Sequence, residues 1–177
     1  MKKPLIGIFP NLEKKLVLEE LPKIVEFCLD NKINIALPRI IAGEFGLPSY
    51  DTNIKDSMNK IGQVVTLGGD GTILRAVRYM APLDIPMLGI NLGKLGFLTE
   101  VGKEQMFEAL LKIRDGNYSV EKRSMLQATM YEGKKMIVQC QAINEFVLAC
   151  CNVSRLTRIS MKIGGQQSPN SPSDGII

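Results

Sequence analysis

The chain contains no histidine among its 177 residues. Without that side chain it cannot form a Ser-His-Asp or Cys-His catalytic site, an H-E-x-x-H metalloprotease motif or the zinc site of a nucleobase deaminase. Any proton transfer must therefore depend on carboxylates, lysine, tyrosine or cysteine. The cysteines form no C-x-x-C pair, and no histidine is present to complete a mixed zinc site. We predict that all four are buried free thiols in a reducing compartment: Cys28, Cys140, Cys150 and Cys151.

Long apolar segments and blocks of like charge are missing as well. The longest uninterrupted apolar run, residues 146–151, has six residues, whereas a membrane-spanning helix needs roughly 20. The apolar run that follows Lys2 and Lys3 is too short for a secretory signal. The net charge is +4 and the basic residues are scattered, which is not the pattern of a nucleic-acid-binding protein. We therefore expect a cytoplasmic protein without a membrane or nucleic-acid partner.

The amino-terminal part alternates short apolar segments with amphipathic ones. Strands are predicted at residues 5–9, 33–37, 61–67 and 85–90, and helices at 16–29, 72–80 and 103–115. Pro22 is expected near the first turn of its helix, where proline is tolerated. Residues 43–53, in which glycine and proline are mixed with polar residues, are predicted to form a surface loop. Alternation of strand and helix predicts an α/β domain whose parallel sheet has helices on both faces.

The pattern changes after residue 118. Residues 126–131, 136–142, 145–151 and 156–163 are strand-like and joined by short turns, which is typical of antiparallel β structure. A mobile loop rich in Gly, Gln, Ser and Pro is predicted at residues 164–174, and a further strand begins after it. We predict an α/β domain at residues 1–118 and an antiparallel β domain at 119–177. The second domain is expected to be incomplete, because so short a β domain leaves a strand edge open.

A glycine-rich turn, Gly68-Gly69-Asp70-Gly71-Thr72, joins the third predicted strand to a helix. Glycine adopts backbone angles closed to other residues and lets a ligand approach the main chain. The N–H groups of such a turn, with the amino end of the helix behind them, form a site for phosphate oxygens. The turn also lies at the sheet edge where α/β proteins bind ligands. Its spacing matches neither the P-loop nor the G-x-G-x-x-G dinucleotide motif.

Asp70 has two interpretations. A carboxylate in a phosphate-binding turn repels the anion, so a chemical role is needed to explain it. It could accept the proton of an attacking hydroxyl group or help to hold a metal ion carried by the nucleotide. The structural alternative is that Asp70 caps the helix, since aspartate is common at helix amino ends. The turn alone favours capping, but the strand before it and further glycine-rich segments downstream favour chemistry.

Four segments in sequence order resemble the NAD kinases, a family within a kinase superfamily that also includes diacylglycerol kinases, sphingosine kinases and phosphofructokinases. Residues 68–72 resemble the hallmark of the superfamily, and residues 89–98 resemble the second glycine-rich motif of the family. Residues 142–145 resemble its Asn-Glu pair at the start of a β strand, and 173–177 the lead-in to its Thr-Gly-Ser-Thr-Ala-Tyr-like segment. The chain stops before that segment, so the resemblance implies a carboxyl-terminally truncated NAD kinase with a β-sandwich-like second domain that binds NAD.

The resemblance implies roles for individual residues. Asp70 would be the catalytic aspartate that takes the proton from the adenosine 2′-hydroxyl of NAD. The turn that receives the ATP phosphates would comprise Gly68, Gly69, Gly71 and Thr72. The NAD site would comprise Asn91, Gly93, Phe97, Asn144, Glu145 and Asp174, with Phe97 near the adenine and Asp174 near the nicotinamide. Taken alone, the same residues would be turn formers, a core phenylalanine and a solvated strand start.

The resemblance thus predicts transfer of the γ-phosphoryl group of ATP to the 2′-hydroxyl of NAD, which forms NADP. It implies a homodimer or homotetramer, with a divalent cation such as Mg²⁺ carried by ATP and no separate protein metal site. Such transfer depends on positioning and charge stabilisation, so histidine is not required. Replacing Asp70 by Asn is expected to lower kcat by about 10²–10⁴ with little change in NAD binding. Two alternatives stay open, a lipid kinase of the same superfamily and a nucleotide-binding fragment without catalysis.

Overall fold

The computed structural model describes residues 5–52, 58–94, 96–149, 157–168 and 171–177. Residues Met1–Lys122 form one compact unit and Arg123–Ile177 a second, whereas the change in sequence pattern places the boundary near residue 118. Within the described ranges, no helix combines the length and the apolar character needed to cross a membrane.

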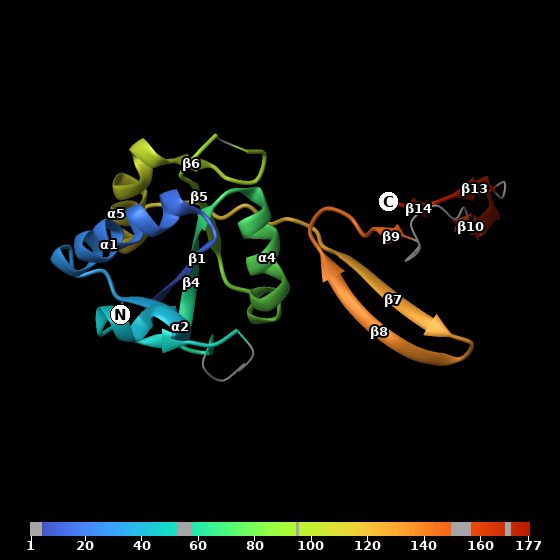
Figure 1. The fold of residues 1–177 in the computed structure, drawn as a ribbon, viewed down its shortest axis with the longest axis horizontal. Helices are drawn as coiled ribbons and strands as arrows, with labels where there is room; N and C mark the ends of the chain where they lie inside the picture. Colours follow the sequence, from blue (N-terminus) through green and yellow to red (C-terminus); the bar gives the residue numbers. More distant parts are fainter. Residues whose placement is uncertain (1–4, 53–57, 95, 150–156, 169–170) are drawn as a thin grey trace. The chain divides into compact units, whose positions relative to one another are not determined.

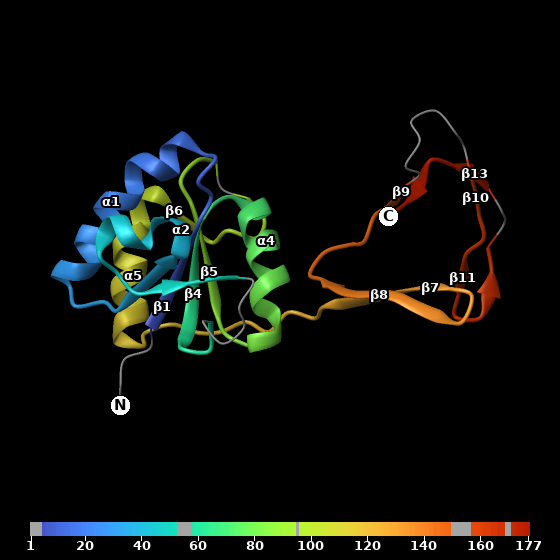
Figure 2. The same cartoon turned by 60° about the horizontal axis from the view of Figure 1, so that its bottom comes forward.

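The first unit is built on a parallel sheet with the strand order β3-β2-β1-β4-β5-β6. The strands are β1 (Leu5–Pro10), β2 (Ile35–Pro38), β3 (Ser49–Tyr50), β4 (Ile61–Gly68), β5 (Met87–Asn91) and β6 (Val101–Gly102). Helices α1 (Lys15–Asp30) and α5 (Met106–Asp115) cover one face, and α4 (Asp70–Met80) covers the other (Figures 1 and 2). Short helical segments complete it: α2 (Arg39–Ala42), η1 (Gly43–Phe45), η2 (Ala81–Leu83) and η3 (Lys103–Gln105). The predicted α/β fold with a parallel sheet is confirmed.

Alternating side chains of each central strand pack into two separate hydrophobic cores, one on each face of the sheet. In β1, Ile6 and Ile8 pack beneath α1 and α5, whereas Phe9 belongs to the cluster beneath α4. In β4, Val65 joins the first cluster and Val64 the second. Because successive strand residues point to opposite faces, a strand covered on both sides must be apolar at nearly every position. This requirement explains the continuous apolar runs that identified these strands in the sequence.

A buried carboxylate joins α1 to the segment that leads into α5. The Glu20 side chain is only 6% exposed, and its Oε1 lies 2.9 Å from Lys23 Nζ and 3.0 Å from Lys103 Nζ. Hydrogen bonds from Lys23 and Lys103 outweigh the cost of burial and hold the pKa of Glu20 below its ordinary value. Lys103 precedes α5 in the chain, so this ion group links the two helices that share one face of the sheet.

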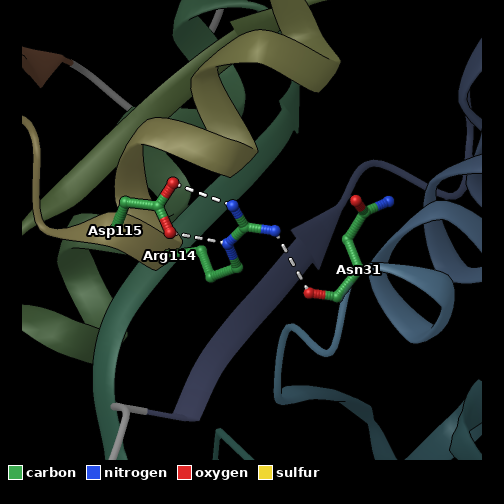
Figure 3. Close-up of polar contacts among 3 residues, drawn as sticks. All are labelled: Asn31, Arg114 and Asp115. Atoms are coloured by element: carbon green, nitrogen blue, oxygen red, sulfur yellow. Dashed lines mark hydrogen bonds and ion pairs between the residues drawn. The ribbon is translucent and has the colours of Figure 1, made fainter.

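The carboxyl ends of the same two helices are joined by Arg114 (Figure 3). Its Nη1 donates to the backbone carbonyl of Asn31 at 3.4 Å. Its Nε and Nη2 donate to the two carboxylate oxygens of the adjacent Asp115, at 2.7 and 2.8 Å. The neighbouring carboxylate thereby fixes the planar guanidinium so that its remaining edge reaches across to the end of α1.

Two local predictions for the first unit are wrong. Helix α1 begins at Lys15, so Pro22 lies in its interior rather than near its first turn, and the Leu18 carbonyl lacks its usual intrahelical donor. Residues 43–53 were expected to form a surface loop, but their described part contains η1 and the edge strand β3. Tyr50 in β3 is 1% exposed, and its hydroxyl donates to the Ile8 carbonyl at 2.7 Å. The glycines and proline around it hide a strand that forms only by pairing with β2.

The second unit consists of antiparallel strand pairs, as predicted. Its longest pair joins β7 (Leu126–Glu132) to β8 (Lys135–Ala142), with Gly133 at φ 59° in the connection. Shorter pairs are β9 (Leu148–Ala149) with β14 (Gly175–Ile176), β10 (Thr157–Ile159) with β13 (Ser171–Ser173), and β11 (Lys162–Ile163) with β12 (Gln166–Gln167). Residues 164–174, predicted to be a mobile loop, therefore contribute strands in their described part.

The cysteine prediction is correct for one described residue and wrong for the other. Cys28 is a buried free thiol in α1, and burial raises its pKa to about 12, so it is protonated and unreactive at neutral pH. Cys140 is also a free thiol but is exposed, because β7 and β8 form a two-stranded sheet whose side chains are mostly exposed on both faces. Cys150 and Cys151 lie outside the described residues.

Candidate active site

The glycine-rich turn lies where the chain connections of the sheet diverge. The chain leaves β1 toward β2 on one side, whereas β4 leads to β5 on the other. In open α/β sheets the crevice at such a switch point, at the carboxyl ends of the strands, is the usual ligand site. The loops after β1 and β4 are in contact there, because the Asn11 N–H donates to the Leu67 carbonyl at 2.9 Å. The fold thus places the turn at the edge that the sequence predicted.

Close packing, rather than unusual backbone angles, explains the first glycine of the turn. A Cβ on Gly68 would lie 2.2 Å from Thr72 Oγ1 and 3.3 Å from Asn11 Cβ, so only glycine fits. Gly71 is different, since no atom of the described residues outside its own helix backbone lies within 4 Å of the position its Cβ would take. None of the glycines at positions 68, 69 and 71 has a positive φ, so left-handed backbone angles are not the reason for glycine in this turn. The bare backbone at Gly71 leaves the amino end of α4 open to a ligand.

The carboxylate of Asp70 bonds to a neighbouring loop and not to its own helix. Its Oδ2 accepts the Phe97 N–H at 2.7 Å, and its Oδ1 accepts the N–H and the hydroxyl of Thr99, both at 3.1 Å. The N-cap of α4 is Gly69, which contributes no side-chain cap. Helix capping therefore does not account for Asp70. The residue connects the first glycine-rich segment to the second.

These hydrogen bonds decide the charge on Asp70. The side chain is half-buried, which disfavours ionisation, but N–H groups of Phe97 and Leu98 together with both Thr99 donors outweigh that effect. They hold the pKa of Asp70 below its ordinary value. At neutral pH the group is a carboxylate and therefore a hydrogen-bond acceptor. A carboxylate with a lowered pKa is better suited to orienting a hydroxyl group than to removing its proton early.

Asn91 and Thr99 shape the second glycine-rich segment from inside. The Asn91 side chain is buried, its Oδ1 accepts the Gly93 N–H at 2.9 Å, and its Nδ2 donates to the Lys94 carbonyl and to Thr99 Oγ1. The Thr99 hydroxyl also accepts the Gly96 N–H at 3.0 Å while it donates to Asp70. The chain of contacts runs from Asn91 through Thr99 to the Asp70 carboxylate. Asn91 thus stabilises the loop from its buried side, and both polar atoms of its side chain are hydrogen-bonded within the protein.

Phe97 lies at the exposed tip of the same segment. Its backbone N–H binds Asp70, yet its side chain is 99% exposed. It is therefore not a core residue in this structure, which removes the structural alternative for it. A fully exposed aromatic ring held next to a charged carboxylate is a surface suited to stacking against a planar ligand.

Comparison with known proteins is consistent with this arrangement. The family model of the ATP-NAD kinase N-terminal domain matches residues 6–118. The NAD kinase of Natranaerobius thermophilus is 36% identical over 173 residues, which are 97% of this chain and 60% of that protein. The NAD kinase of Thermoanaerobacter sp. strain X514 is 36% identical over 177 residues, or 100% of this chain and 62% of that protein.

The chain belongs to the NAD kinase family. It spans about three-fifths of the length of these relatives. The crystal structure of yeast NADH kinase complexed with NADH superposes with a TM-score of 0.80 at 20% identity, covering 97% of this chain and 56% of that one. At that identity the likeness concerns the fold, and it covers both the parallel sheet and the antiparallel pairs.

The remaining family-motif residues lie in the second unit. Asn144 and Glu145 are exposed in the segment between β8 and β9. The strand that was predicted to begin at Glu145 begins three residues later, at Leu148. Asp174 is exposed between β13 and β14. The pair Gly175–Ala149 places Asp174 beyond one end of the β9–β14 pair and Glu145 beyond the other. Within this unit the structure therefore does not bring Asp174 together with the Asn-Glu pair.

Sequence reasoning missed two residues that touch Asp70. Neither Thr99 nor Gly96 was among the predicted site residues, although a Cβ on Gly96 would lie 2.2–2.4 Å from the Asp70 carboxyl atoms. A signal was present, because Gly69-x-x-Thr72 and Gly96-x-x-Thr99 share one spacing. In both, the glycine N–H donates to the threonine hydroxyl, at 3.4 and 3.0 Å. The repeated spacing marks two turns with the same local hydrogen bond.

Proposed function

We propose that the protein is an NAD kinase that transfers the γ-phosphoryl group of ATP to the adenosine 2′-hydroxyl of NAD. The observation that carries the proposal is the turn at Gly68–Thr72, which exposes bare backbone at the start of α4 beside the carboxylate of Asp70. Membership of the NAD kinase family supports the choice of NAD as acceptor.

On the donor side, the N–H groups at the amino end of α4 receive the phosphates of ATP. Gly71 leaves that end uncovered, and the partial positive charge of the helix favours an anion there. Among the described residues no group of three or more His, Cys, Asp and Glu side chains could hold a metal ion. We propose that a divalent cation, Mg²⁺, arrives with ATP and neutralises charge on the phosphate oxygens, as phosphoryl transfer requires.

On the acceptor side, Asp70 orients the 2′-hydroxyl and receives its proton late, when bond formation has made the oxygen acidic. A lowered pKa fits this order of events, because such a carboxylate is a poor base for an unreacted sugar hydroxyl. Phe97 presents its exposed ring to the adenine. The family motifs imply that Asn144, Glu145 and Asp174 bind NAD as well.

The test is NADP formation by the full-length protein and by its Asp70→Asn variant. We expect kcat to fall by about 10²–10⁴ in the variant, the usual contribution of a positioned proton acceptor. Because Asp70 also holds the loop that carries Phe97, we now expect weaker NAD binding too, in contrast to the expectation from the motif alone. Asp84→Asn is the matched control, since Asp84 is exposed beyond the opposite end of α4.

Three outcomes would reject the proposal or part of it. Near-normal turnover of Asp70→Asn would remove that residue from the chemistry. Phosphorylation of diacylglycerol vesicles in place of NAD would indicate a lipid kinase. Calorimetric binding of NAD and ATP without turnover in the full-length protein would indicate a nucleotide-binding module.

We also propose that the protein is a cytoplasmic homodimer or homotetramer without a nucleic-acid or membrane partner. The support is the family resemblance, in which the residue corresponding to Asp174 is often reached from a neighbouring subunit. Sedimentation velocity of the full-length protein tests the assembly, and a single species at the mass of one chain would contradict it.

A further inference from the structure

Lys14 lies in the loop that faces the glycine-rich turn across the switch point. It is the N-cap residue of α1, directly after the residues that follow β1. Its N–H donates to the Asn11 carbonyl at 3.1 Å, and the Asn11 N–H donates to Leu67 at the end of β4. Two backbone hydrogen bonds thus tie the position of Lys14 to the strand from which the turn begins.

The side chain of Lys14 extends over the turn itself. A Cβ on Gly69 would lie 3.3 Å from Lys14 Nζ, so the ammonium group lies against the backbone of Gly69. For the other two glycines of the turn, Gly68 and Gly71, no lysine or arginine is among the nearest described atoms around the Cβ position. Glycine at position 69 therefore leaves room for a positive charge next to the N–H groups of α4.

The ammonium group of Lys14 has no hydrogen-bond or ion-pair partner within the described part of the chain. Four other lysines of the first unit are paired, because Lys15, Lys23, Lys103 and Lys112 each lie within 4 Å of a glutamate carboxylate. Among the described lysines, Lys32, Lys60 and Lys94 also have no such pair, so the position of Lys14 over the turn is what distinguishes it. The nearby Asp70 carboxylate bonds to neutral donors in the adjacent loop. A lysine held over an anion-binding turn without a carboxylate of its own is free to bind an anion.

We propose that Lys14 binds a phosphate group of the phosphoryl donor. This inference rests on the proposed function, in which the Gly68–Thr72 turn receives the triphosphate of ATP. Main-chain N–H groups and the helix end supply only partial positive charges, whereas a bound triphosphate carries several full negative charges. An ammonium group adds a full compensating charge and a charge-assisted hydrogen bond. Lys14 would thereby raise the affinity for ATP without touching NAD.

The test compares Lys14→Met, Lys14→Arg and Lys15→Met in the full-length protein. Methionine keeps the aliphatic length and removes the charge, and arginine restores the charge. Lys15 is the matched control, because it is the adjacent lysine, is 91% exposed and pairs with Glu19 at 3.6 Å. Steady-state kinetics give the KM values for ATP and NAD, and calorimetry gives the Kd values for ATP, ADP and AMP.

We expect Lys14→Met to raise the KM and Kd for ATP about 10- to 150-fold, the range of one hydrogen bond to a charged group. The KM for NAD should change less than about twofold, and Lys14→Arg should recover most of the ATP affinity, since both effects follow from charge alone. The loss should be small for AMP, which has neither the β- nor the γ-phosphate. It should be present for ADP if the contact is to the β-phosphate and absent for ADP if the contact is to the γ-phosphate. Lys15→Met should behave as the wild type.

The two proposals fail in distinguishable ways. Unchanged ATP affinity in Lys14→Met, with normal NADP formation by the wild type, would overturn the role of Lys14 and leave the kinase intact. An equal loss in Lys15→Met would also overturn it, because the effect would then be one of general surface charge. If the wild type binds ATP without forming NADP, the kinase proposal fails while the Kd values still decide the role of Lys14. Absence of ATP binding by the wild type would reject both.

Discussion

Replacing Gly96 by alanine should break the connection between Asp70 and the second glycine-rich segment. The added Cβ would lie 2.2–2.4 Å from the three atoms of the Asp70 carboxyl group, whereas ordinary contact begins at 3.4 Å. Bringing 2.2 Å to 3.4 Å requires a displacement of about 1.2 Å. The Phe97 and Thr99 N–H groups donate to this carboxylate at 2.7 and 3.1 Å, so the same displacement lengthens both hydrogen bonds past their useful range.

The size of the expected change in amide exchange follows from the negative charge on the Asp70 acceptor. A hydrogen bond to a charged group contributes about 1.5–3 kcal/mol, and loss of one corresponds to about a 10- to 150-fold change in an opening equilibrium. Native-state amide exchange measures this locally. We expect the Phe97 and Thr99 amides of Gly96→Ala to exchange faster by that factor at neutral pH. Gly93→Ala is the matched control, because among the described residues its Cβ would meet only Asn91 Oδ1, at an ordinary 3.7 Å.

The pH dependence gives a second check with a definite sign. The folded-state pKa of Asp70 is lowered from its ordinary value of 3.8, so its stabilising effect is complete above that value and is lost as the pH falls through the lowered pKa. The difference between wild type and Gly96→Ala should therefore shrink in acid. Equal exchange rates of both amides in wild type and Gly96→Ala at neutral pH would show that the Asp70 carboxylate does not protect them. A difference in exchange that does not depend on pH would show the same.

Two further predictions separate structural from ligand-binding contributions. Glu20→Gln should lower the free energy of unfolding by about 1–3 kcal/mol, because a nearly buried carboxylate loses two ammonium partners. The control Glu19→Gln, at an exposed glutamate, should change the free energy of unfolding by less than about 0.5 kcal/mol. The measurement is urea unfolding followed by circular dichroism, because the chain has no tryptophan. Equal urea midpoints for Glu20→Gln and Glu19→Gln would contradict the prediction. Gly68→Ala should destabilise by about 1–3 kcal/mol because its Cβ overlaps Thr72 Oγ1. Gly71→Ala should leave stability within about 0.5 kcal/mol and raise the KM for ATP, and the reverse ranking of the two variants would show that Gly71 has the structural role.

The sequence predicted the glycine-rich turn, the strand before it and the helix after it, because each depends on local chemistry. About a dozen consecutive residues contain the apolar run of the buried strand, the glycines and the start of the helix. It did not predict what Asp70 contacts, since Phe97 and Thr99 are 27 and 29 residues away in the chain. Only the pairing of β4 with β5 brings the two glycine-rich segments to the same edge of the sheet.

The errors have the same origin. Tyr50 is buried because β3 pairs with β2, although glycine and proline near it are typical of a loop. Cys140 is exposed although it lies in a strand-like segment, because β7 and β8 form a two-stranded sheet. In each case the local pattern is compatible with two environments, and the choice depends on which segments pack against it.

The amino-acid sequence was enough to predict the order of β1, β2, β4 and β5 and of α1, α4 and α5, but not β3 or β6. It also indicated the change to antiparallel β structure after residue 118 and the family to which the chain belongs. Hydrophobic periodicity and short motifs involve residues close together in the chain, so they can be recognised in the sequence without the structure. The tertiary structure alone decided that Thr99 and Gly96 enclose the carboxylate of Asp70 and that Lys14 lies over Gly69. Those contacts join loops after β1, β4 and β5, and only the lateral order of the strands sets the distances between such loops.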